Sequence, residues 1–253
     1  MKNLMQRGLR SVAHTLIPPR ILKHQIAHRN WRRGEREIKF LHELVDPART
    51  AVDVGAYMGA YTYFLAKLAT HVHAFEPQVS CQEFLSRAYP EKVTVHRSAV
   101  SNFNGEMGMQ NAHYDSQNQG ARLHSQENLP ADSASPASLF EVTVTRLDDV
   151  DLGTVGFIKI DAEGEESNVL EGAETLVETN KPVLLIEIEQ RHREQDIYEV
   201  FKKIESIGYN GQFILDGERR SLRTFSVEHH QFARLKGDKT QPYINNFIFE
   251  PKR

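Results

Sequence analysis

The amino-acid sequence predicts an α/β fold in which a mostly parallel sheet is covered by helices on both faces. From Thr50 onward, short apolar runs of strand length alternate with segments whose apolar residues have helical spacing. Glycines and acidic residues follow the ends of several of these runs. Such alternation is typical of parallel sheets, because each crossover helix covers one face of the sheet. At 253 residues the chain suits one domain with additions, or at most two small domains.

The expected strands and helices follow one another in a regular order. Apolar runs predict strands at residues 50–54, 72–75, 93–95, 156–160, 183–187, 213–215 and 246–249. Helical spacing predicts helices at residues 35–45, 59–69, 80–88, 166–178 and 194–207. Two further strands, 107–109 and 142–145, are expected to form a hairpin at one edge of the sheet. Residues 110–140 contain few apolar side chains and are expected to form a long loop or lid.

Residues 1–34 form a basic arm before a body of residues 35–253. The arm and the two residues after it contain nine lysines and arginines against Glu35 as the only acid, and the rest of the chain is net acidic. We expect a helical arm, interrupted at Pro18-Pro19, that folds onto the body or onto a partner subunit. Peripheral contact with an anionic membrane surface is the alternative. Nucleic acid is not expected as a partner because the body is acidic.

The composition is that of a soluble protein from a reducing compartment. No apolar run is long enough to span a bilayer, and the N-terminus lacks the continuous apolar segment of a secretory signal. Cys81 is the only cysteine, so no intrachain disulfide can form. We therefore expect a cytoplasmic protein, with peripheral attachment to a membrane surface as a variant of that location.

The first strand leads into a turn of the kind that binds nucleotides. This turn spans residues 53–59 and has the sequence DVGAYMG. Gly55 allows a tight turn and a close approach of the backbone to a ligand, and Gly59 opens the next helix. Asp53 lies at the carboxyl end of the strand, where open α/β sheets bind their ligands.

The second strand is followed by Glu76, whose carboxylate can accept hydrogen bonds from both hydroxyls of a ribose. Pro77 then directs the chain away from the sheet. A nicotinamide dinucleotide usually requires a G-x-G-x-x-G turn, but Tyr57 occupies the position of the second glycine here. S-adenosylmethionine has no phosphate, and its α-amino group suits an acid such as Asp53. The sequence therefore favours S-adenosylmethionine over NAD as the cofactor.

A second motif follows the strand at 156–160. It has the sequence KIDAEGEE at residues 159–166, and the helix after it contains VLEGA at residues 169–173. This segment resembles the FkbM-type methyltransferase family, whose members carry a Lys-x-Asp-x-Glu-Gly element before a Val-Leu-Glu-Gly-Ala helix. Further matching pieces are DVGA at 53–56, AFEP at 74–77, AVS at 99–101, RLDD at 146–149 and NNFI at 245–248. The resemblance extends over nearly the whole chain outside the basic arm.

The resemblance implies a Rossmann-like class I methyltransferase fold, with a seven-stranded sheet whose last strand is antiparallel. It also implies transfer of a methyl group from S-adenosylmethionine, usually to an oxygen of a sugar or natural-product scaffold. Carried over by position, the methionine end of the cofactor would lie at Asp53, Gly55 and Gly59, and the ribose at Glu76.

The resemblance also assigns positions farther along the chain. Ser98 and Ala99 would lie near the adenine, and Asp161 and Glu163 would lie between the cofactor and the methyl acceptor. The family usually has asparagine where this chain has Tyr57, so the conformation of that turn is the part of the cofactor site to be checked in the structure.

Methyl transfer to a hydroxyl benefits from a general base near the acceptor proton. Asp161 and Glu163 follow a buried strand, and His192 follows the next strand and has an ordinary pKa near neutrality. These three residues are the catalytic candidates, and Lys159 is expected to pair with one of the acids. No spacing indicates an obligatory metal, although a divalent cation could be bound by Asp161, Glu163, Glu187, Glu189 and His192.

Three functions remain open on the sequence alone. The expected function is methylation of a hydroxyl on a sugar, a glycan or a small natural-product metabolite. The alternative is a non-catalytic scaffold that binds S-adenosylmethionine or a nucleotide and uses the basic arm for a partner, and only Tyr57 favours it. An NAD-dependent oxidoreductase is disfavoured by the spacing of the glycines.

Overall fold

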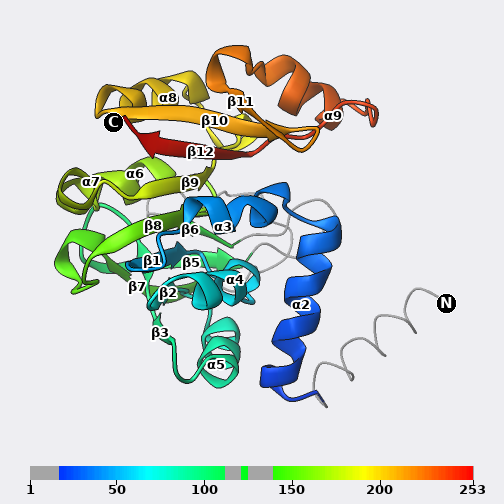
Figure 1. Ribbon diagram of the computed structural model, residues 1–253. Helices are drawn as coiled ribbons and strands as arrows, with labels where there is room; N and C mark the ends of the chain where they lie inside the picture. Colours follow the sequence, from blue (N-terminus) through cyan, green and yellow to red (C-terminus); the bar gives the residue numbers. More distant parts are fainter. Residues whose placement is uncertain (1–16, 112–120, 125–138, 253) are drawn as a thin grey trace.

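The centre of the computed structural model, which describes residues 17–111, 121–124 and 139–252, is an eight-stranded sheet (Figure 1). Its strands are β1 (Thr50–Val54), β2 (Val72–Phe75), β3 (Val93–His96), β8 (Val155–Ile160), β9 (Val183–Glu187), β10 (Tyr209–Leu215), β11 (Glu218–Ser221) and β12 (Asn246–Pro251). They lie in the order β11-β10-β12-β9-β8-β1-β2-β3. The five strands from β3 to β9 pair in parallel, whereas β12 runs antiparallel to β9 and β10.

The expected number of seven strands was wrong by one. β11 adds an eighth strand, antiparallel to β10. The two strands are joined by Asp216 and Gly217, whose φ angles are 53° and 79°. Positive φ at both central residues is the requirement of the two-residue hairpin turn that matches the twist of its strands. The polar sequence of β11 carries no apolar alternation that would indicate a strand.

Helices cover both faces of the sheet. They are α2 (Pro19–Arg33), α3 (Leu41–Leu44), α4 (Ala60–Leu68), α5 (Val79–Ala88), α6 (Glu166–Glu171), α7 (Glu174–Asn180), α8 (Ile197–Ser206) and α9 (Ala233–Leu235), with shorter helical turns at η1 (Arg36–Phe40), η2 (Leu147–Asp149), η3 (Gln190–His192), η4 (Leu222–Thr224) and η5 (Glu228–Phe232). One face packs against α6, α7 and α8, and the other packs against η1, α3 and α4. α2 lies outside this second layer, against α4 and α5 (Figure 1).

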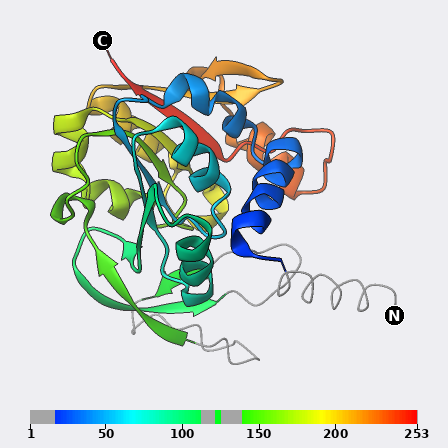
Figure 2. The ribbon, with the colours of Figure 1, turned by 60° about the horizontal axis from the view of Figure 1, so that its bottom comes forward.

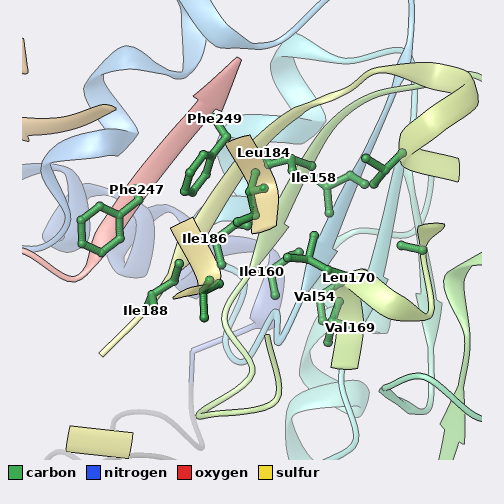
Figure 3. Close-up of a cluster of buried hydrophobic side chains, with 14 of the residues drawn as sticks. Val54, Ile158, Ile160, Val169, Leu170, Leu184, Ile186, Ile188, Phe247 and Phe249 are labelled. Atoms are coloured by element: carbon green, nitrogen blue, oxygen red, sulfur yellow. The ribbon is translucent and has the colours of Figure 1, made fainter. Parts of the chain in front are cut away.

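The central strand β8 shows how side chains are divided between the two faces. Ile158 and Ile160 pack with Val169 of α6 on one face, as the buried cluster in Figure 3 shows. Phe157 belongs to the cluster on the other face, and Lys159 shares that side because successive residues of a strand alternate. Burial of each large apolar side chain contributes about 1.5–3 kcal/mol. The alternation therefore places one charged residue, Lys159, inside an otherwise apolar strand.

A second, smaller sheet is built from the segment between β3 and β8 (Figure 2). Its strands are β4 (Ala99–Val100), β5 (Gly105–Asn111), β6 (Ala121–His124) and β7 (Leu139–Thr145), in the order β4-β7-β5-β6. β5 and β7 pair antiparallel as expected, but the pair belongs to this separate sheet and not to an edge of the main one. β6 lies inside the range expected as a loop, and the rest of 112–138 lies outside the described residues.

α2 begins at Pro19, at the expected interruption of the arm, because proline is tolerated in the first turn of a helix, where its missing N–H has no partner to lose. Two other helical regions differ from expectation. The helix expected at 166–178 is divided into α6 and α7 at Gly172 and Ala173. The helix expected at 35–45 is a 3-10 turn followed by the short α3. Among the described helices, none is long and apolar enough to cross a bilayer.

Gly172 is a packing constraint at the junction of α6 and α7. A Cβ at this position would lie 2.0 Å from the carbonyl oxygen of Ser101, so the glycine lets the junction pack directly against the chain after β4. We expect Gly172→Ala to lower the free energy of unfolding by about 1–3 kcal/mol through this overlap. Urea denaturation measures the effect. Gly105→Ala is the control, because its Cβ would make only ordinary contacts, at 3.5 Å from Phe103; an equal loss in both variants would contradict the assignment.

Candidate functional site

The carboxyl ends of five parallel strands lie along one edge of the main sheet. In the strand register Val54 lies opposite both Phe75 and Ile160, Phe75 lies opposite His96, and Ile160 lies opposite Ile186. The residues that follow these positions therefore share one edge. β2 and β3 follow β1 on one side, and β8 and β9 lie on its other side. Such a switch in strand order is where α/β proteins bind ligands.

Glu76 follows β2 at this edge and is held by two backbone donors. Tyr57 N–H donates to Oε2 and Gln78 N–H donates to Oε1, each at 2.7 Å. The carboxyl group is only 2% exposed, and burial raises its pKa to about 7. Each carboxylate oxygen has a second lone pair, so the group can accept two more hydrogen bonds. A pair of ribose hydroxyls matches that capacity.

The turn between β1 and α4 has a left-handed backbone at three residues. The φ angles are 76° at Gly55, 47° at Tyr57 and 75° at Gly59. A Cβ on Gly55 would lie 1.9 Å from the carbonyl oxygen of Asp161, and one on Gly59 would lie 2.8 Å from Leu85. The two glycines thus let the turn pack closely on the end of β8 and on α5. Their role is in the first place to shape the turn.

Tyr57 occupies a position that disfavours large side chains. Non-glycine residues with positive φ are uncommon, and asparagine adopts this conformation several times more readily than most. The structure therefore gives a physical reason for asparagine at this position in the family resembled. The backbone N–H of Tyr57 nevertheless stabilises the turn by donating to Glu76. The Tyr57 side chain is 55% exposed.

Asp53 points into the layer between β1 and α4. Its Oδ2 accepts a hydrogen bond from Thr62 Oγ1 at 2.5 Å, and the residue is 2% exposed. Burial raises the pKa of this carboxyl to about 6, although the Thr62 hydrogen bond and the nearby Lys159 oppose the shift. Asp53 thus lies near the carboxyl end of β1, as the sequence predicts. It is as buried as Glu76, and its Oδ2 is already bonded to Thr62.

Lys159 is a buried cation that interacts with several acids of this edge. Its ammonium group lies 3.4 Å from Asp161 Oδ2 and 5.1 Å from the centre of the Tyr61 ring, and the side chain is 1% exposed. Burial alone lowers the pKa of a lysine, but Asp161, Glu35, Glu187 and Asp53 together raise it above its ordinary value. The expected pairing of Lys159 with an acid is therefore confirmed, and the partner is Asp161.

Glu35 was not among the predicted site residues. Its Oε2 accepts hydrogen bonds from Tyr61 Oη at 2.7 Å and from Asn246 Nδ2 at 3.0 Å. It thereby connects the segment after α2 with α4 and with the first residue of β12. Asn246 is 2% exposed, and within the described chain its Oδ1 has no hydrogen-bond partner. No local pattern around Glu35 marks it, since the contacts come from residues up to 211 positions away.

Glu163 and His192 approach each other beside Asp161. His192 Nδ1 lies 3.6 Å from Glu163 Oε2, and the two side chains are 7% and 24% exposed. Glu163 has φ 52° and Gly164 has φ 111°, so the chain turns sharply between β8 and α6. A Cβ on Gly164 would lie 3.4 Å from the carbonyl oxygen of His192. The structure thus brings together two catalytic candidates that are 29 residues apart in the sequence.

Two acids, the last residue of β9 and the second residue after it, complete the edge. Glu187 Oε1 accepts a hydrogen bond from Asn245 Nδ2 at 2.7 Å, and burial raises its pKa well above the ordinary value. Glu189 accepts hydrogen bonds from Tyr243 at 2.5 Å and from Arg191. Burial opposes ionisation of Glu189, but these donors lower its pKa overall. The described residues contain no group of three or more side chains arranged to hold a metal ion.

The remaining predicted residues lie around β3 and Glu76. Ser98 and Ala99 are both 7% exposed and connect β3 to the second sheet. The side chain of Ala99 packs in the cluster of that second sheet, so only its backbone can face the edge. Pro77 follows Glu76, and its carbonyl oxygen accepts a hydrogen bond from Gln82 Nε2 at 2.8 Å. Gln82 therefore secures the start of α5 behind Glu76.

Comparisons with known proteins agree with this arrangement. Residues 53–210 match the family model described as the methyltransferase FkbM domain. Among solved structures, the chain is similar to a methyltransferase FkbM from Methylobacillus flagellatus KT, with a TM-score of 0.51, 20% identity, and coverage of 90% of this chain and 57% of that one. This chain thus spans a little over half the length of that protein. A search of curated proteins finds no match.

Two more solved structures are similar to the chain at lower TM-scores. An rRNA methylase from Streptococcus thermophilus has a TM-score of 0.46 and 16% identity, over 85% of this chain and 94% of that one. A SAM-dependent methyltransferase from Aquifex aeolicus has a TM-score of 0.44 and 16% identity, over 92% and 98%. The match over residues 53–210 includes the turn after β1, Glu76 and the motif after β8. A protein of this family is consistent with S-adenosylmethionine as the cofactor. The chain belongs to the FkbM methyltransferase family.

Proposed function

We propose that this methyltransferase transfers the methyl group of S-adenosylmethionine to a hydroxyl of a sugar, a glycan or a small natural-product metabolite. The observation that carries the proposal is the pairing of Glu163 with His192 next to Asp161, at the strand ends beside the cofactor half of the edge. A histidine with a carboxylate partner is suited to accept a proton from a hydroxyl.

The cofactor half consists of the turn after β1 and Glu76. Glu76 is held in place by two N–H donors and keeps the capacity to accept two ribose hydroxyls. Asp53 and the turn shaped by Gly55 and Gly59 would face the methionine end. Ser98 and the backbone of Ala99, beyond β3, would border the adenine. Among the described residues, the side chains named here for the cofactor half are carboxylates and include no basic group for a pyrophosphate, which suits a cofactor that carries no phosphate.

On the acceptor side, the protein has to orient a hydroxyl and remove its proton. S-adenosylmethionine, when bound, supplies a methyl group on a positively charged sulfur. We assign His192 as the base that would accept the proton of the acceptor hydroxyl. Glu163 would orient the imidazole and stabilise its protonated form, as carboxylates do for histidine bases in general. Asp161, which pairs with Lys159, would position the acceptor between the cofactor and His192.

The scaffold alternative loses its only support. It rested on Tyr57, but this residue maintains the turn and donates its N–H to Glu76. The Tyr57 side chain is 55% exposed. Asp53 and Asp161, two acids that a scaffold would not require, make specific contacts with Thr62 and Lys159, which supports the methyltransferase proposal.

Cofactor binding tests the first half of the proposal. S-adenosylhomocysteine should raise the melting temperature and NAD should not, because a ligand stabilises only the state it binds. Glu76→Gln should weaken S-adenosylhomocysteine binding by about tenfold to a hundredfold in calorimetry, since it removes a charged acceptor of two hydrogen bonds. Glu178→Gln, on the exposed side of α7, is the control and should bind normally. Unchanged binding in the Glu76 variant would remove this carboxylate from the cofactor site.

The acceptor half is tested by turnover. Transfer of a tritiated methyl group to a panel of monosaccharides, glycosides and phenolic natural products would identify an acceptor. With that acceptor, His192→Gln should lower kcat by about a hundredfold to ten-thousandfold while the affinity for S-adenosylhomocysteine is retained. Glu163→Gln should lower kcat less, and exposed His229→Gln should have no effect. A His192 variant with normal kcat would exclude it as the base.

The buried Glu76 also predicts a pH dependence of stability without cofactor. Its pKa rises from about 4.5 to about 7 on folding, so between these values the folded protein holds a proton that the unfolded chain has released. The free energy of unfolding should therefore fall as the pH rises across this range, by up to about 3 kcal/mol from this group. Glu76→Gln should be less sensitive to pH than the native protein in urea denaturation. Parallel pH profiles would show that Glu76 does not titrate as described.

A further inference from the structure

The outward face of α2 is basic and contains two exposed apolar side chains. At about 100° per residue, one side of this helix is buried and the other is open to solvent. Leu22, Ile26 and Ala27 pack against α4 and α5 and are 5% exposed or less. The exposed side consists of Arg20, Ile21, His24, Gln25, His28, Arg29, Trp31 and Arg32. We call this set the α2 outer face.

The arginines of the α2 outer face have no acidic counterpart in the described part of the chain. α2 contains no acid, and no ion pair joins Arg20, Arg29 or Arg32 to a described carboxylate. Exposed cations elsewhere are commonly paired, as Lys202 is with Glu199. Burial and the nearby cations Arg20 and Lys67 lower the pKa of Lys23, which lies beside this face. Positive charge is therefore concentrated here on a protein that is net negative.

Ile21 and Trp31 give this face an apolar component. They are 55% and 43% exposed, and they are two of the few large apolar side chains that the described surface leaves open. They lie near the two ends of the 15-residue helix, which is about 22 Å long. Lys39 lies 5.8 Å from the centre of the Trp31 ring, so a further cation borders the indole. Arginine with tryptophan and an aliphatic residue is the composition that suits the interface of a lipid bilayer.

We propose that the α2 outer face docks the protein on an anionic lipid bilayer, with α2 parallel to the membrane plane. The arginines would lie at the lipid phosphates, and Ile21 and Trp31 would enter the boundary between headgroups and acyl chains. The net negative remainder of the protein would be repelled by the same surface, which restricts contact to this face. A nucleic acid would match the arginines but would leave Ile21 without an apolar environment. A second copy would have to present an acidic face of matching shape.

The chain provides its own spectroscopic probe, because Trp31 is its only tryptophan. Full-length protein is mixed with vesicles of phosphatidylcholine alone or of phosphatidylcholine with phosphatidylglycerol, and both Trp31 fluorescence and co-sedimentation are measured. We expect a blue shift and co-sedimentation only with the anionic vesicles, and both should weaken with added salt. Brominated acyl chains in the anionic vesicles should quench the fluorescence, which a purely electrostatic contact above the headgroups would not produce.

Charge reversal assigns the binding to this helix. A triple variant, Arg20→Glu, Arg29→Glu and Arg32→Glu, keeps all the basic residues before Ile17, so any loss of binding belongs to α2. Each basic residue at an anionic surface contributes about fivefold in partitioning, so the loss should be on the order of a hundredfold or more. The control is Arg223→Glu, Lys239→Glu and Lys252→Glu, three exposed positions with the same change in net charge. Equal melting temperatures would show that both variants fold.

Three outcomes would overturn the proposal. In the first, the triple α2 variant binds anionic vesicles with the same affinity as the native protein or as the control variant. The native protein could ignore vesicles but shift its Trp31 fluorescence with duplex RNA or DNA, which would assign the face to nucleic acid. It could also ignore vesicles and show a concentration-dependent dimer that the triple variant lacks, which would assign the face to self-association. Cofactor binding is measured alongside, since its failure would concern the proposed function and not this surface.

Discussion

The buried ammonium group of Lys159 is the constraint on which the functional edge of the sheet depends. A lysine inside a strand that is otherwise apolar is costly unless carboxylates surround it. Here they come from four separate parts of the chain: Asp161 after the same strand, Asp53 on β1, Glu187 on β9 and Glu35 before η1. Burial of an ionised carboxylate in this region would in turn be unfavourable without the lysine. The cluster therefore requires the sheet, the helix layer over it and the amino-terminal segment to be assembled together.

This cluster also joins the two halves of the proposed site. Gly55 packs on the carbonyl oxygen of Asp161, so the turn of the proposed cofactor half directly contacts the first residue of the proposed acceptor half. The carboxylates nearest the cofactor half, Asp53 and Glu76, have raised pKa values because they are buried. Beyond β8, Asp161 pairs with Lys159 and Glu189 pairs with Arg191, whereas burial raises the pKa of Glu187.

The strands buried on both faces could be predicted from the sequence, because β1, β8 and β9 are mostly apolar runs of strand length. The strand that was missed carries a weaker local signal. β11 is polar and lacks the alternation of apolar and polar residues that marks a strand. Among the proposed site residues, Asp161, Glu163 and His192 could be named from the sequence because they follow strands. Glu35 could not, since its importance lies only in contacts made across the fold.

The position of Glu35 couples two regions that are otherwise distinct. α2 ends at Arg33, and two residues later Glu35 is hydrogen-bonded to Tyr61 and Asn246 within the field of Lys159. A displacement of α2 as a rigid helix would pull this carboxylate away from the lysine and expose the cluster to an imbalance of charge. Any ligand whose affinity depends on that cluster would therefore be linked to the proposed docking of α2 on a membrane. Because such linkage is reciprocal, occupation of the proposed cofactor site would change the affinity of α2 for the membrane by the same factor by which the membrane would change cofactor affinity.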